Sequence, residues 1–158
     1  MPISSYVIAL GSNRRGRHGS PRAQVRAALA LLGRVQAVSR LRETAPLGPS
    51  RRRFANAVAL IRSEEAPDAL LRRLKAIERE FGRRRGQRWG ARVIDLDIVL
   101  WSGGCWRTPA LTVPHLSYRE RRFVLAPLAE IAPDWRDPVS GRKTHALLHA
   151  VDRPRPRA

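Results

Sequence analysis

The chain has 158 residues, of which 43% are hydrophobic, and this fraction excludes an intrinsically disordered protein. A single cysteine excludes an intramolecular disulfide and a cysteine-rich zinc site. No apolar run is long enough for a signal peptide or a membrane span. We therefore expect a cytoplasmic protein with no membrane contact. The net charge of +18 attracts polyanions, although nearly all basic residues are arginine, and such a bias is also a compositional habit of some genomes.

The apolar pattern predicts three strands, two helices and a further strand in the first two thirds of the chain. Residues 6–10 are apolar on both faces, as expected of a central strand. Ser20 and Pro21 are typical of a helix start, and Gly33 of a helix end. The remaining segments are strands at 35–44 and 54–61, a helix that starts at Pro67 and ends at Gly82, and a strand at 93–100.

This order of elements, βαββαβ, predicts an α+β, ferredoxin-like fold. We expect a four-stranded antiparallel sheet with both helices on one face. Short helical segments at 121–132 and 144–151 add a C-terminal helical extension. Residues 1–152 are expected to form a single domain, and the proline-rich basic tail at 153–158 is expected to be disordered.

The last predicted strand places two acids side by side. Because side chains of a strand alternate between its faces, Asp95 and Asp97 share one face, where their like charges repel unless a cation lies beside them. The opposite face carries Ile94, Leu96, Ile98 and Leu100, and the arginines upstream are Arg83, Arg84, Arg85, Arg88 and Arg92. Acids that bind a hard divalent cation, next to arginines that bind phosphate, are components of a phosphoryl-transfer site. A solvated sheet face whose aspartates pair with the arginines explains the same pattern, and these residues alone leave both interpretations open.

Motifs along the whole chain add a more specific signal. They are Gly11-Ser12-Asn13, the run RWGARVIDLDI at 88–98, TVPH at 112–115, and the separate residues Phe54, Asn56 and Phe123. With these motifs, the chain resembles the 6-hydroxymethyl-7,8-dihydropterin pyrophosphokinases of folate biosynthesis from residue 6 to about residue 135. The resemblance implies transfer of pyrophosphate from ATP to the hydroxymethyl group of the pterin, with release of AMP.

The resemblance also implies roles for individual residues. Asp95 and Asp97 would bind two Mg²⁺ ions that bridge the ATP phosphates, with Arg83 and Arg92 as catalytic, phosphate-contacting arginines. Further ATP contacts are implied at Ile98, Thr112, His115 and Arg121. The implied pterin site consists of the stacking rings Phe54 and Phe123 with Thr44, Leu47, Asn56 and Asp95. Trp89 belongs to a loop implied to close over the site. No residue is a dedicated general base, and the proton of the attacking hydroxyl could pass to a metal-bound water or to Asp97.

Several residues depart from the family pattern. Leu116 and Arg42 replace frequent tyrosines, Ala110 stands where an arginine can occur, and Arg51-Arg52-Arg53 replace an acidic segment. These changes leave open a relative on the same fold that binds pterin or nucleotide with altered or lost transferase activity. A basic nucleic-acid-binding module is a remote alternative, because few aromatic residues accompany the basic runs. We therefore expect ATP and the pterin as partners, no specific nucleic acid, and a monomer.

Overall fold

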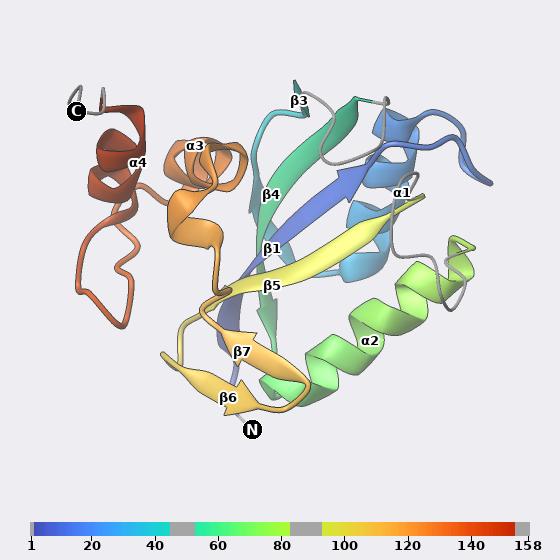
Figure 1. The fold of residues 1–158 in the computed structure, drawn as a ribbon. Helices are drawn as coiled ribbons and strands as arrows, with labels where there is room; N and C mark the ends of the chain where they lie inside the picture. Colours follow the sequence, from blue (N-terminus) through green and yellow to red (C-terminus); the bar gives the residue numbers. More distant parts are fainter. Residues whose placement is uncertain (1, 45–52, 83–92, 154–158) are drawn as a thin grey trace.

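The computed structural model describes residues 2–44, 53–82 and 93–153 (Figure 1). In chain order the elements are β1 Ser4–Ser12, α1 Pro21–Leu32, β2 Val35–Val38, β3 Arg42–Thr44, β4 Phe54–Ser63, α2 Pro67–Glu80, β5 Asp95–Trp101, β6 Trp106–Thr108, β7 Leu111–Val113, a 3₁₀ helix Tyr118–Glu120, α3 Arg122–Ile131 and α4 Thr144–Asp152. Among the described residues, no helix is both long enough and apolar enough to cross a membrane.

The main sheet is antiparallel and has the strand order β2-β4-β1-β5, with β3 also paired to β4. In the part of the chain that the structure describes it therefore has five strands, and the expected count of four is wrong. The expected strand at 35–44 is divided into β2 and β3, which pair with successive parts of β4. The sequence pattern also missed the separate hairpin of β6 and β7, which includes Thr112 and Val113 of the TVPH motif.

The division of this strand has a physical cause in a contact with α3. Ser39 still follows β4, because its backbone N–H donates to the Val58 carbonyl and its Oγ accepts from the Val58 N–H, both at 2.9 Å. The next backbone N–H, that of Arg40, instead donates to Oε1 of Glu130 in α3 at 3.1 Å. The chain thus leaves the ladder at Arg40 and rejoins it at Arg42.

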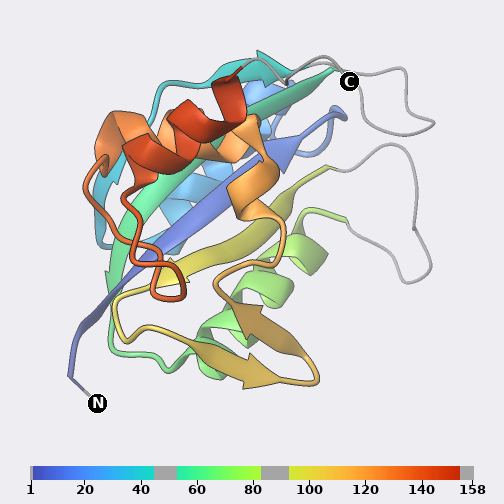
Figure 2. The ribbon, with the colours of Figure 1, turned by 60° about the vertical axis from the view of Figure 1, so that its left-hand side comes forward.

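Two hydrophobic cores lie on opposite faces of the sheet (Figures 1 and 2). Along β1, Tyr6, Ile8 and Leu10 face α1 and α2, as the expected arrangement of these helices requires. The alternate residue Val7 faces the second core, which is built with α3 and α4. The C-terminal extension therefore covers the face of the sheet that α1 and α2 leave uncovered.

The second core does not extend along the whole sheet. On the face toward α3, the side chains of β1 become smaller in the order Val7, Ala9, Gly11. Val7 is fully buried in the second core, whereas Ala9 and Gly11 line a pocket. This end of the sheet face carries the candidate site.

Candidate active site

Three neighbouring strands bring the polar residues of the site together. In register, Gly11 of β1 lies between Asn56 of β4 and Asp95 of β5. Ala9 of β1 lies beside Asp97, which follows Asp95 by two residues in β5. Because Gly11 and Ala9 have the two smallest side chains, the sheet between the amide and the two carboxylates forms an open floor.

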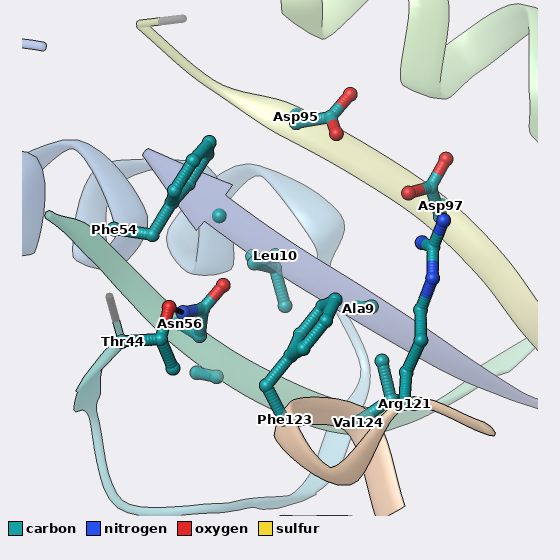
Figure 3. Close-up of a pocket in the computed structure, with 12 residues that line it drawn as sticks. Ala9, Leu10, Thr44, Phe54, Asn56, Asp95, Asp97, Arg121, Phe123 and Val124 are labelled. Atoms are coloured by element: carbon teal, nitrogen blue, oxygen red, sulfur yellow. Dashed lines mark hydrogen bonds between the residues drawn. The ribbon is translucent and has the colours of Figure 1, made fainter. Parts of the chain in front are cut away.

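Two aromatic rings flank a pocket above this floor (Figure 3). Phe54 is the first residue of β4, and Phe123 lies in the first turn of α3. The pocket is lined by Ala9, Leu10, Gly11, Thr44, Phe54, Asn56, Ala57, Asp95, Asp97, Arg121, Phe123 and Val124. The structure thus brings together all the residues predicted to contact the pterin except Leu47, which lies outside the described residues.

Asn56 presents an oxygen toward this pocket. Its Nδ2 donates a hydrogen bond of 2.6 Å to Oγ1 of Thr44, which leaves Oδ1 on the side of the floor. A Cβ atom built on Gly11 would lie 3.1 Å from that Oδ1, so a larger residue at this position would crowd the amide. The pocket therefore has a hydrogen-bond acceptor held in place between two aromatic faces.

The two acids line the opposite side of the pocket (Figure 3). Burial, the neighbouring carboxylate of Asp95 and the charge of Glu78 raise the pKa of Asp97 to about 6, although Lys75 and Arg121 act in the opposite direction. Each of the three causes disfavours the carboxylate anion relative to the neutral acid. A cation bound between the acids would reverse this preference.

A second pocket lies on the other side of Asp97. It is lined by Leu71, Lys75, Leu96, Asp97, Ile98, Pro109, Ala110, Leu111, Thr112, His115, Leu116 and Ser117. Ile98, Thr112 and His115, which were predicted to contact ATP, share this pocket. Asp97 lines both pockets, so the two cavities meet at this residue.

His115 has a defined tautomer in the second pocket. Its Nδ1 accepts a hydrogen bond of 3.2 Å from the backbone N–H of Ser117, so Nε2 carries the proton of the neutral ring. Burial and the positive charge of Arg121 lower the pKa of His115, against a smaller opposite effect of Asp95. At neutral pH the ring is therefore an uncharged N–H donor.

Arg121 lies between the residues of the first pocket and those of the second pocket. It lines the first pocket, where its guanidinium carbon is 5.6 Å from the centroid of the Phe123 ring and its side chain extends toward Asp97 (Figure 3). Its charge also reaches the second pocket, because it lowers the pKa of His115. The side chain of Arg121, which was predicted to contact ATP, therefore faces the junction of the two pockets.

The comparisons with known proteins identify the family. The family model of 7,8-dihydro-6-hydroxymethylpterin-pyrophosphokinase (HPPK) matches residues 7–133. The chain belongs to this family. The HPPK match thus spans both pockets, from β1 to the end of α3.

Relatives of known name support the HPPK assignment. A 2-amino-4-hydroxy-6-hydroxymethyldihydropteridine pyrophosphokinase of Pseudomonas aeruginosa is 45% identical over 154 residues, which are 94% of this chain and 92% of the relative. The enzyme of the same name from Haemophilus influenzae is 41% identical over 138 residues, which are 84% and 83% of the two chains.

Solved structures show the same fold. A crystal structure of Plasmodium falciparum HPPK-DHPS with STZ-DHP superimposes on 94% of this chain with a TM-score of 0.74 and 14% identity. This chain covers 45% of that longer protein.

Some predicted HPPK residues are not placed and others were missed. Leu47, Arg83, Trp89 and Arg92 lie outside the described residues. Glu78, which was not among the predicted residues, is a buried acid of α2 that lies close enough to Asp97 to raise the pKa of Asp97. Helical spacing gives only a partial signal, because position 78 follows the apolar residue Leu74 by four and so borders the apolar stripe of the helix, which does not show whether the acid is buried.

Proposed function

We propose that this chain transfers pyrophosphate from ATP to the hydroxymethyl group of 6-hydroxymethyl-7,8-dihydropterin, with release of AMP, as a step of folate biosynthesis. The observation that carries the proposal is the meeting of two differently built pockets at Asp97. One pocket suits a flat heterocycle and the other suits a nucleotide. The acceptor hydroxyl and the donor phosphates would then meet beside the two acids.

The first pocket would hold the pterin between Phe54 and Phe123. Stacking on two aromatic faces stabilises a flat ring, and the fixed acceptor of Asn56 would read one of its N–H groups. Thr44 holds that amide in place, and Asp95 lies across the floor from it. Leu47, which lies between β3 and β4 in the sequence, would add a contact.

The second pocket would hold ATP through Ile98, Thr112 and the N–H donor of His115. An uncharged donor orients a phosphate without adding to the positive charge of Arg121, which would approach the same phosphates from the first pocket. The resemblance adds Arg83 and Arg92 as phosphate-contacting residues. Fixed donors of this kind act by alignment and by stabilising charge in the transition state.

Asp95 and Asp97 fit a magnesium site. Among the described residues, no group of three or more His, Cys, Asp or Glu side chains could hold a metal ion. An ion at this pair would take other ligands from phosphates and water. Mg²⁺ prefers such a ligand set. Two Mg²⁺ ions held there would neutralise charge on the phosphates. The contribution of the chain is to hold both carboxylates on one face of β5.

The experiment that tests the function is AMP formation from ATP. It should require both 6-hydroxymethyl-7,8-dihydropterin and Mg²⁺. Asp95→Asn, which keeps the side-chain size but removes the charge, should lower the rate by about a hundredfold or more, because a bound metal ion contributes several kcal/mol to charge stabilisation. Pterin-independent AMP formation, or no AMP at all, would contradict the proposal.

A further inference from the structure

Glu78 of α2 is a buried acid to which the proposed reaction gives no role. Its side chain is only 1% exposed, and a buried carboxylate lowers the stability of a protein unless its partners compensate for the lost hydration. Its Oε2 accepts a hydrogen bond of 3.0 Å from the backbone N–H of Leu96, and its Oε1 lies 3.3 Å from Nζ of Lys75. The carboxylate thus contacts the backbone of β5.

The N–H group that Glu78 binds belongs to the residue between the two acids. Within the described residues, β5 is the last strand of the order β2-β4-β1-β5, and it contacts α2. Asp95 and Asp97 lie opposite Gly11 and Ala9 of β1, whereas the N–H of Leu96 points away from β1. Such outward N–H groups of an edge strand need a partner when they are buried, and Glu78 supplies it.

We propose that Glu78 is a positioning residue, which holds the N–H of Leu96 and thereby fixes the stretch of β5 that carries Asp95 and Asp97. The inference rests on the proposed function, because that function assigns metal binding to Asp95 and Asp97. With β1 on one edge and a helical carboxylate on the other, the peptide groups on both sides of Leu96 are fixed. Metal and phosphate ligands need such support, since small displacements of their oxygens weaken binding.

A direct role as a metal ligand fits the geometry less well. Asp95 and Asp97 project from the face of β5, whereas Glu78 approaches its edge and uses Oε2 for Leu96. Binding an ion through that oxygen would break the bond to Leu96. Lys75, which lines the second pocket, is close to the other oxygen.

Three variants separate position from charge. Glu78→Gln keeps the size and an acceptor oxygen but removes the charge. Glu78→Leu keeps a similar size but removes the acceptor. Glu80→Ala is the matched control, because Glu80 is an exposed acid of the same helix.

The first measurement is amide hydrogen exchange of Leu96 by NMR in the protein without metal or substrate. Glu78→Leu should accelerate this exchange by about tenfold or more, which corresponds to the loss of one charge-assisted hydrogen bond. Glu78→Gln should stay within about threefold of wild type, because its carbonyl oxygen still accepts the bond. Unchanged exchange in Glu78→Leu would overturn the proposal.

The second measurement is the Mg²⁺ concentration that gives half-maximal binding of a non-hydrolysable ATP analogue. It should rise about tenfold in Glu78→Leu, rise at most about threefold in Glu78→Gln, and stay unchanged in Glu80→Ala. A purely structural role would lower the unfolding midpoint without this shift, and would overturn the proposal. So would an equal shift in the Leu and Gln variants, because charge rather than position would then be responsible.

Different results would contradict the proposed transferase function and the proposed role of Glu78. A wild-type protein that binds the magnesium nucleotide but forms no AMP would contradict the transferase function. The exchange of Leu96 and the Mg²⁺ dependence of nucleotide binding would still decide whether Glu78 positions the two acids, because neither requires turnover.

Discussion

At the scale of single residues, Asp97 is the group whose charge is least favourable in the ligand-free site. It lines both pockets, and burial together with Asp95 and Glu78 raises its pKa to about 6. Above that pH the negative carboxylate lowers the stability of the fold. The negative charge that would bind a cation therefore lowers the stability of the protein when no cation is bound.

Asp97→Asn should therefore stabilise the metal-free protein at pH 8 while it removes activity. Below about pH 4, Asp97 is protonated in both the folded and the unfolded chain, and the two proteins should be equally stable. Between about pH 4 and pH 6 the unfolded wild type is ionised while the folded wild type is still largely protonated, so the wild type loses stability over this range and the variant does not. Above pH 6 the variant should be more stable by about 1–2 kcal/mol, as measured by thermal unfolding at a series of pH values.

The control for this prediction is Asp134→Asn, because the side chain of Asp134 is 75% exposed. Its stability should change by less than about 0.5 kcal/mol at any of these pH values. A loss of stability in Asp97→Asn at pH 8 would mean that the carboxylate makes favourable contacts in the folded protein. Activity close to that of wild type would remove Asp97 from the site.

The positions of the acids were predictable from the sequence, whereas that of Glu78 was not. Alternation along a strand is a property of the backbone, so residues 93–100 alone placed Asp95 and Asp97 on one face. Glu78 borders the apolar stripe of α2, and an acid in that position is buried or exposed according to what the helix packs against. In this structure the carboxylate of Glu78 accepts a hydrogen bond from the N–H of Leu96, which lies in β5.

At the scale of elements, Glu130 connects β3 to α3. Its Oε1 accepts from the backbone N–H of Arg40, and its Oε2 accepts from Nη2 of Arg42 at 2.9 Å. β3 ends with Thr44, which holds Asn56, and α3 carries Phe123. The connection therefore sets the separation of two walls of the first pocket.

Glu130→Ala should weaken pterin binding without weakening nucleotide binding. The side chains of Glu130 and Arg42 are 27% and 32% exposed, so loss of the connection should cost about 1 kcal/mol. Steady-state kinetics should show a KM for the pterin that is raised about threefold to tenfold, with the KM for ATP unchanged.

Glu64→Ala is the matched control, because Glu64 forms a surface ion pair with Arg34 at the opposite end of β4 and has a side chain that is 63% exposed. It should leave both KM values unchanged. If Glu130→Ala raised both KM values equally, the connection would support the fold in general rather than the first pocket.

The same contact explains why the strand at 35–44 was predicted incorrectly. Alternation indicates an extended chain, but it does not show where that chain leaves its neighbour. The break follows from the bond between the N–H of Arg40 and Glu130, which are 90 residues apart. A pairing at that distance has no local signal, whereas the caps of α1 and the glycine motif of β1 do.

At the scale of the whole molecule, helices cover both faces of one sheet (Figure 2). The two cores share this sheet, and the site lies where the second core ends. Neighbouring residues of β1 contribute to different cores, with Val7 in one and Ile8 in the other. We therefore propose that residues 1–152 unfold as a single domain. The C-terminal helices matter to the site because α3 carries Phe123.

One buried ion pair anchors the segment between α3 and α4. Asp137 has a fully buried side chain and accepts two hydrogen bonds from Arg119 in the 3₁₀ helix, with 2.8 Å between Nη2 and Oδ1. The N–H of Val139 and the hydroxyl of Ser140 also donate to it, at 3.0 and 2.9 Å. The guanidinium of Arg119 holds the pKa of Asp137 well below its usual range, although burial acts in the opposite direction.

Asp137→Asn should lower stability at pH 7 by about 2–4 kcal/mol, because it leaves a partly buried guanidinium without its charged partner. A carboxyl pKa that is depressed on folding contributes stability above its unfolded value and loses that contribution as the pH falls through the folded value. The wild type should thus lose stability progressively below about pH 4, and the variant should show a flatter profile there. Denaturant unfolding from pH 7 to pH 2 measures both effects.

Asp152→Asn is the control for this last prediction, because Asp152 binds Arg122 at 2.8 Å through side chains that are 41% and 64% exposed. Exposed ion pairs contribute little, so its loss should stay below about 1 kcal/mol and its acid profile should follow that of wild type. Parallel acid profiles for the wild type and Asp137→Asn would show that other carboxylates cause acid unfolding. The ion pair would then hold the segment between α3 and α4 in place without controlling the stability of the molecule at low pH.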